Sequence, residues 1–158
     1  MSAAQSAPLQ ELRGVLIPTG SAPLLLPNAA MAEVIDYREV TARPKQAPRW
    51  VLGSVVWRRR PMPLISIERM MGGTFDPHQS RLRIAVCHGL RIDGSLPFIG
   101  IVSRGIPRLV RVSESVIGAE RFPPLDPSVP ILARVHLRGD TALIPDLDSI
   151  SELLRQAL

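Results

Sequence analysis

Short apolar runs recur along this chain at intervals of about eight to twelve residues, and turn-forming residues separate them. Runs of this length are typical of strands, and their regular spacing indicates a β-sandwich or a β-barrel. The fold class is therefore predicted to be all-β. The predicted strands cover residues 15–17, 24–26, 51–57, 64–67, 82–87, 98–102, 109–112, 131–137 and 142–144.

Turn residues between the runs support this interpretation. Asp93-Gly94 is expected to close a tight hairpin between the strands that begin at Leu82 and Phe98, because both residue types tolerate positive φ angles. Gly139-Asp140 is expected to do the same between the last two strands. The chain has 16 prolines, which cannot donate to a central ladder and so belong at strand ends and edges.

Two segments have the pattern of short helices. The first covers residues 28–36, where Asn28 is a suitable N-cap and the apolar side chains fall on one face. The second begins at Ser149, whose hydroxyl forms a capping-box pattern with Glu152. We expect this C-terminal helix to pack back onto the strands, because its apolar residues also share one face.

Length and composition indicate one packed unit. Apolar residues make up 46% of the chain and charged residues 21%, which argues against a disordered linker. Residues 1–10 are expected to form a flexible tail and residues 11–158 one domain of two small barrels, with a break near residues 72–80. Prolines interrupt the longest uncharged stretch, residues 14–32, so membrane insertion is not expected. With one cysteine, Cys87, and no signal segment, the predicted location is the cytoplasm.

Catalytic and cofactor chemistry is not expected. The histidines lie far apart without ligand spacing, so no metal site is predicted. Cys87 and His88 are neighbours on a predicted strand and therefore point to opposite faces, which disfavours a nucleophile–base pair. Asp146 and Asp148 precede the C-terminal helix, where carboxylates stabilise the helix N-terminus. No glycine-rich segment has a phosphate-binding or dinucleotide-binding pattern.

One cluster, Trp57 followed by Arg58, Arg59 and Arg60, has two functional interpretations beside the simple one of a core strand that ends in a solvated basic turn. Tryptophan and arginine supply a large share of the binding energy at protein interfaces, which favours a protein partner. Stacking tryptophans and phosphate-binding arginines are also typical of small barrels that bind single-stranded nucleic acid. That alternative requires these arginines to converge with Arg104, Arg108 and Arg111 on one face.

The order of motifs over residues 16–154 resembles the CheW-like family of chemotaxis coupling proteins. A glycine followed by a short strand that ends in an arginine is the most recognisable of them. The motifs are Leu24-Leu25-Leu26-Pro27, Glu33-Val34, Val51-Leu52-Gly53-Ser54-Val55-Val56-Trp57-Arg58, Pro63-Leu64-Ile65-Ser66-Ile67, Phe98-Ile99-Gly100-Ile101-Val102 and Leu143-Ile144-Pro145-Asp146-Leu147-Asp148.

The resemblance implies two interlocked five-stranded β-barrels, with a short helix after the second strand and a C-terminal helix. It also implies a non-catalytic adaptor that needs no cofactor and couples a methyl-accepting chemoreceptor tip to the regulatory domain of a CheA-type histidine kinase. The protein would then lie in the cytoplasm at the chemoreceptor array, with no nucleic acid as partner. The residues that this interpretation assigns to partner binding are Met31, Glu33, Val34, Ile35, Gly53, Trp57, Arg58, Gly100 and Ile101.

Two departures from the family pattern indicate that partner specificity has changed. Arg59 stands where the family usually has a glycine, at a turn that favours positive φ. Ser103-Arg104 replaces an aliphatic–acidic pair and reverses a charge. These substitutions point to a divergent, ChpC-type coupling protein of a type IV pilus system that controls twitching motility.

Overall fold

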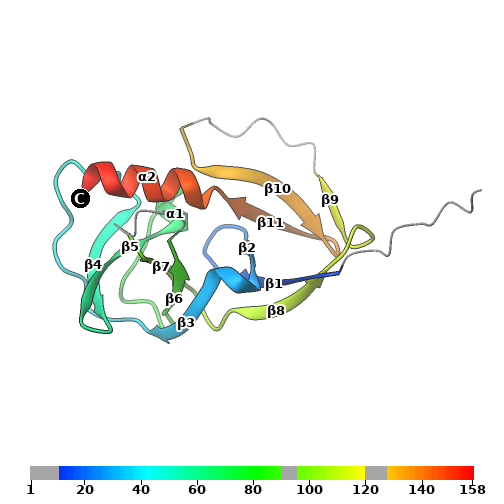
Figure 1. Cartoon of the computed structure of the whole chain (residues 1–158), viewed down its shortest axis with the longest axis horizontal. Coiled ribbons are helices and arrows are strands. Elements are labelled where there is room, and N and C mark those ends of the chain that lie inside the picture. The colour runs from blue at the N-terminus through cyan, green and yellow to red at the C-terminus, as the bar shows by residue number, and fades with distance from the viewer. Residues whose placement is uncertain (1–10, 90–95, 120–127) are drawn as a thin grey trace, which may run out of the picture.

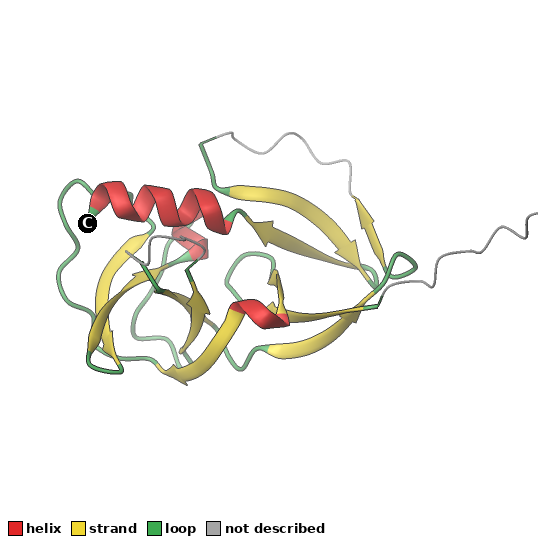
Figure 2. Cartoon of the chain, viewed as in Figure 1, coloured by secondary structure: helices red, strands yellow, loops and turns green. Residues whose placement is uncertain are grey.

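The computed structural model describes residues 11–89, 96–119 and 128–158, and in these it is mostly β (Figures 1 and 2). Their strands form two sheets, of five and six strands. The first sheet contains β3 (Met31–Asp36), β4 (Val51–Trp57), β5 (Arg60–Ile65), β6 (Arg83–His88) and β7 (Phe98–Ser103). The second contains β1 (Leu12–Ile17), β2 (Leu24–Pro27), β8 (Arg108–Val112), β9 (Ile117–Ala119), β10 (Ile131–Leu137) and β11 (Asp140–Pro145). Nine of these strands match the predicted runs.

The two sheets interlock through the chain order. The five-stranded sheet has the order β3-β6-β7-β5-β4 and comes from the middle of the chain, whereas the six-stranded sheet, β8-β1-β2-β11-β10-β9, comes from both ends. Each sheet contains one parallel pair, β5 with β7 and β2 with β11, and the remaining pairs are antiparallel. The chain crosses between sheets after β2 and after β7. Residues 72–80, near the expected break, connect two strands of the same sheet.

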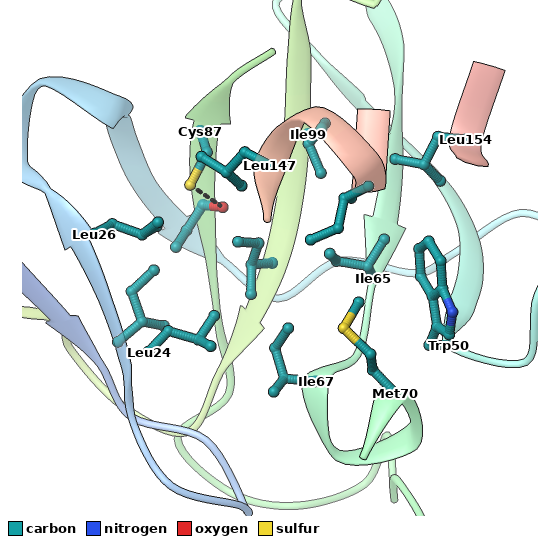
Figure 3. Close-up of a cluster of buried hydrophobic side chains, with 14 of the residues drawn as sticks. Leu24, Leu26, Trp50, Ile65, Ile67, Met70, Cys87, Ile99, Leu147 and Leu154 are labelled. Carbon is teal, nitrogen blue, oxygen red and sulfur yellow. Dashed lines mark hydrogen bonds between the residues drawn. The ribbon is translucent and has the colours of Figure 1, made fainter. Parts of the chain in front are cut away.

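Strand alternation produces three apolar clusters. One face of the five-stranded sheet packs on itself through residues such as Trp57, Leu64 and Ile84, and one face of the six-stranded sheet does so around Leu16 and Leu137. The opposite faces of both sheets meet in a larger central cluster, in which side chains of β2 lie against those of β5 and β6 (Figure 3). Each sheet therefore has its own interior, and the two share a third core, which is the expected two-barrel arrangement.

The C-terminal helix α2 (Leu147–Ala157) extends from β11 toward the five-stranded side (Figure 1). Its buried residues Leu147, Ile150 and Leu154 belong to the central cluster, so the helix packs back as predicted. It begins earlier than the predicted start at Ser149, because Asp146 is the N-cap and its carboxylate accepts from the Ser149 amide at 3.1 Å.

The predicted helix over residues 28–36 is wrong in most of its length. A single 3-10 turn, η1 (Asn28–Ala30), follows β2, and Met31 begins strand β3. The β-branched residues Val34 and Ile35 favour an extended backbone, and the open edge of β6 supplies antiparallel hydrogen-bond partners for it. Tertiary pairing therefore overrides the helical spacing of the apolar residues.

Two short elements had no signal in the apolar runs, namely helix α1 (Ile67–Met70) and strand β9. The Ser66 hydroxyl accepts from the Arg69 amide and caps α1. The last hairpin turns at Arg138 and Gly139, with φ of 52° and 87°, one residue before the predicted Gly139-Asp140. The Asp93-Gly94 hairpin lies outside the described residues, although β6 and β7 do pair antiparallel as it requires.

Gly53 allows the five-stranded sheet to close on itself. Thr41, which follows β3, forms an isolated bridge with Ser54 of β4, so the two edges of the sheet meet. A Cβ atom at Gly53 would lie 1.9 Å from the Thr41 carbonyl oxygen, and the Gly53 φ is +143°. Only glycine combines this backbone conformation with so close an approach.

Candidate partner-binding site

Trp57, at the end of β4, is the centre of the candidate site. Its side chain is buried inside the five-stranded sheet, where the ring meets Phe98 edge-on at a centroid distance of 4.6 Å. The indole Nε1 donates a hydrogen bond of 2.9 Å to Glu33 Oε2 on β3. The indole N–H therefore has a hydrogen-bond partner and the ring has an apolar neighbour, so contacts from β3 and β7 fix the orientation of the side chain.

Arg58 lies over this tryptophan and reaches the same carboxylate. Its guanidinium carbon is 4.4 Å from the Trp57 ring centroid, and its Nη2 is 3.7 Å from Glu33 Oε2. The Arg58 side chain nevertheless stays 71% exposed. Stacking on the ring and the long ion pair orient the guanidinium without covering it, so donors remain for a partner.

The turn that carries Arg58 is a two-residue hairpin. Trp57 pairs with Arg60, and the residues between them have φ of 48° at Arg58 and 65° at Arg59. These angles match the twist of the flanking strands, but side chains other than glycine adopt them at a cost of roughly 1 kcal/mol each. The predicted strain at Arg59 is therefore real, and it falls on Arg58 as well.

Glu33, Trp57 and Arg58 thus form one contiguous group, which we call the Arg58 corner. Two exposed valines lie on the strands that carry it, Val34 on β3 at 37% and Val56 on β4 at 57%. An oriented guanidinium beside aliphatic side chains and a rigid aromatic base is the composition expected at the centre of a protein interface.

The other residues assigned to partner binding from the sequence lie mainly in the interior. Met31 is half-buried, with its Sδ 3.8 Å from the Cys87 thiol, and Ile35 belongs to the interior cluster of the five-stranded sheet. Ile101 is fully buried in the central cluster. Gly100 faces the interior, where a Cβ atom would lie 3.0 to 3.1 Å from Ile84, Leu64 and Met62. With Gly53 at the sheet closure, these positions shape the barrel that supports the Arg58 corner.

A second polar group, which we call the Glu68 junction, was missed in the sequence. Glu68 lies in the first turn of α1, and its carboxylate is buried. The carboxylate accepts hydrogen bonds from the Arg104 Nε at 3.1 Å and from the Ser66 hydroxyl at 3.1 Å. It also accepts from the Gly20 amide in the β1–β2 connection. The Arg104 amide in turn donates to the Pro18 carbonyl at 2.8 Å. The signal available in the sequence was a single glutamate within residues 67–71, a segment that is otherwise apolar apart from Arg69.

The Glu68 junction explains the charge reversal at Ser103-Arg104. Arg104 neutralises a buried carboxylate and fastens the five-stranded sheet to the β1–β2 connection of the other sheet. The buried Ser103 hydroxyl donates to the Gly105 carbonyl at 2.7 Å and so supports the same loop. The two substituted positions therefore serve the contact between the sheets.

The residues considered for catalysis do not form a common site. Burial raises the pKa of the Cys87 thiol to about 12, which opposes formation of a nucleophilic thiolate. Asp146 caps α2, and His88 lies beside the Phe98 ring at a centroid distance of 5.4 Å. Within residues 11–89, 96–119 and 128–158, three or more His, Cys, Asp or Glu side chains nowhere gather as metal ligands would.

The arginines required by the nucleic-acid alternative are divided between the two sheets. Arg58, Arg59 and Arg60 lie at the β4–β5 turn, whereas Arg108 and Arg111 lie on β8 (Figure 1). Arg104 is paired with Glu68. The positive charges therefore do not form the continuous stripe that nucleic-acid binding requires.

Comparisons with known proteins agree with this architecture. The sequence matches the family model described as "CheW-like domain" over residues 13–155. The crystal structure of the scaffolding protein TtCheW from Thermoanaerobacter tengcongensis superimposes with a TM-score of 0.68 and 16% identity, over 93% of this chain and 91% of that one. A search of the curated proteins finds no match.

Two interlocked β-barrels that share one core define the class of this fold. More particularly, the chain belongs to the CheW-like domain family, because the family match covers nearly its whole length. That family comprises non-catalytic adaptors of chemosensory signalling. In the part of the chain that the structure describes, no helix has the length and apolar character needed to span a membrane.

Proposed function

We propose that this protein holds the regulatory domain of a CheA-type histidine kinase and the tip of a methyl-accepting chemoreceptor in a fixed relation. The observation that carries the proposal is the Arg58 corner within a CheW-like domain, where a rigid base presents a largely exposed guanidinium. In this role the protein transmits receptor conformational changes through interface geometry, and it acts in the cytoplasm at the receptor array.

The nine assigned residues then divide into two roles. Glu33, Val34, Trp57 and Arg58 contact a partner directly or orient the side chain that does. The interior residues keep the strands in the register that places this corner, and they act on binding through the fold. They are Met31, Ile35, Gly53, Gly100 and Ile101.

A titration of the intact protein with the purified kinase regulatory domain tests this role. Arg58→Ala removes the exposed guanidinium and should weaken binding by roughly tenfold or more, as expected for an interface hot spot. Arg59→Gly is the matched control, because it removes the same charge from the same turn while keeping the positive φ. Its affinity should stay within about threefold of the wild type.

Salt dependence separates this function from nucleic-acid binding. Kinase binding through a desolvated corner should change only modestly between 0.05 and 0.2 M salt, whereas oligonucleotide binding should fall by orders of magnitude. Equal loss of kinase affinity in Arg58→Ala and Arg59→Gly would contradict a specific role for Arg58. Saturable oligonucleotide binding without kinase binding would replace the proposal.

The departure at Arg59 supports a narrower proposal, that the protein is a ChpC-type adaptor of a type IV pilus system. Arg59 adds an exposed cation to the same turn, which would disfavour partner surfaces that are positively charged at this place while adding little affinity for the protein's own partner. Capture of partners by the tagged full chain from its own cells tests this step. Recovery of only flagellar-type receptors and kinase would contradict it.

A further inference from the structure

Two neighbouring cavities open on the five-stranded sheet, away from the Arg58 corner. The smaller, about 340 Å³, lies between the β3–β4 connection and the segment that follows α1. The larger, about 460 Å³, lies beside it, and the two share Arg69 and Phe75 as walls. We call this pair of adjoining compartments, which differ in chemistry, the Arg69 cleft.

The smaller compartment is lined by three arginines, Arg43, Arg49 and Arg69, and by no carboxylate. Arg43 is held in place, because its Nη1 donates to the Ala47 carbonyl at 2.8 Å and to the Pro48 carbonyl at 3.1 Å. Within residues 11–89, 96–119 and 128–158, no hydrogen-bonding or ion-pair partner engages the guanidinium of Arg49 or Arg69. Three cations that share one cavity repel each other, and an anion bound between them would relieve this.

The larger compartment has an aromatic and aliphatic lining. Tyr37 and Phe75 lie with ring centroids 6.2 Å apart, and Val40 and Leu52 complete the apolar wall. Burial raises the pKa of Tyr37, and the positive charge of Arg69 opposes that rise, so the field of this arginine reaches the aromatic wall. An apolar or planar group would be desolvated here beside the arginine-lined compartment.

We propose that the Arg69 cleft binds a small phosphate-bearing molecule with a planar ring, of the mononucleotide type. The phosphate group lies among the three arginines, whose planar forks match its oxygens, and the ring packs against Phe75 and Tyr37. Glu39, on the rim of the larger compartment, is positioned to accept from an amino or hydroxyl group of the ligand. This site is independent of the proposed partner-binding corner.

Isothermal titration of the full chain with adenosine monophosphate, inorganic phosphate and adenosine tests the proposal. We expect saturable binding of the nucleotide, weaker binding of phosphate alone, and none of adenosine at the same concentration. Arg49→Ala combined with Arg69→Ala should lower the affinity for the nucleotide by roughly a hundredfold, about tenfold for each charged hydrogen-bonding partner. An unchanged thermal midpoint shows that this variant is folded.

The matched control is Arg108→Ala combined with Arg111→Ala, which removes two charges from an arginine-lined cavity beside β8 in the six-stranded sheet. Its nucleotide affinity should equal that of the wild type. Equal weakening in both double variants would overturn the proposal, because the effect would then follow net charge alone. Absence of saturable nucleotide and phosphate binding to the wild type would also overturn it. Arg49→Lys, which keeps the charge but not the fork, should bind with intermediate affinity.

Discussion

The five-stranded and six-stranded sheets have strands of similar length, yet they close differently. The edges of the five-stranded sheet meet at the Thr41–Ser54 bridge and at the hydrogen bond between Trp57 and Glu33, around a filled interior. In the six-stranded sheet, a cavity of about 790 Å³ lies between edge strand β8 and the β10–β11 hairpin. The edges of the first unit are thus joined around Trp57, whereas the second has open space beside β8.

This difference has a physical basis in local packing. At the closure of the five-stranded sheet, glycine permits an approach that any Cβ atom would prevent. In the six-stranded sheet, Gly118 of strand β9 has open space around its missing side chain. Glycine is thus a requirement at residue 53 and incidental at residue 118, since only crowding around the missing side chain makes glycine necessary.

The largest expected effect comes from breaking the closed sheet. Gly53→Ala should lower the free energy of unfolding by about 3 kcal/mol, because it combines backbone strain with a clash against the Thr41 carbonyl. Urea unfolding followed by tryptophan fluorescence measures this. Gly118→Ala in the six-stranded sheet is the control and should change stability by less than about 0.5 kcal/mol. Similar losses in both variants would refute the contrast between the sheets.

The second effect tests the Glu68 junction that joins the two units. Arg104→Ala leaves the buried Glu68 carboxylate without its cation and should cost about 2 kcal/mol, less than for a fully buried pair because Arg104 is 36% exposed. Arg155→Ala, which breaks the exposed pair with Glu152, should cost about 0.5 kcal/mol or less. A loss in Arg104→Ala no greater than in Arg155→Ala would mean that the junction adds little to stability.

The third effect concerns the core that the two sheets share, where Cys87 is buried. The folded-state pKa of its thiol, about 12, lies above the ordinary value of 9.0, so the thiol stabilises the fold below pH 9 and this contribution is lost as pH rises toward 12. Between pH 9 and 10, the wild type should lose about 1 kcal/mol more than Cys87→Ala. If the free energy of unfolding had the same pH dependence in both proteins, the pKa of the thiol would not be raised by burial.

The smallest effect compares the two hairpin turns. Arg59→Gly in the β4–β5 turn and Arg138→Gly in the β10–β11 turn should each stabilise the protein by about 0.5 kcal/mol, because glycine relieves the positive φ and gives back part of that gain as backbone entropy. Thermal unfolding midpoints measure the change. A lower midpoint for Arg59→Gly would show that the arginine makes contacts worth more than the strain it causes.

Much of the fold was predictable from local patterns. The apolar runs predicted both ends of β4, β6, β7 and β10 to within one residue. A strand with a buried face must carry apolar residues along its length, so its extent can be recognised in the sequence. The short helix near Ser149 was also predictable, since its apolar face and capping residues are local. The helix predicted over residues 28–36 was wrong because the apolar spacing there fits a helix, whereas hydrogen bonding to the edge of β6 stabilises a strand.

The Arg58 corner was only partly predictable. Trp57 and Arg58 are neighbours in the chain, so their association was visible, but Glu33 joins them only because β3 and β4 meet across the closed sheet. The pairing in the Glu68 junction was not predictable, because Glu68 and Arg104 are far apart in the chain, and the sequence marked Arg104 as a departure from the family pattern without indicating its partner. Likewise, Arg43, Arg49 and Arg69 come from a loop and a helix that share a cavity only in the folded protein.

The sequence by itself determined that this chain is all-β and that it resembles the CheW-like family, because strand periodicity, turn residues and motif order are properties of neighbouring residues. Tertiary structure alone decided which sheet is closed, which charges are paired and which arginines remain open to a partner or an anion. These features depend on contacts between residues distant in sequence, and such contacts arise only when the two sheets pack against one shared core.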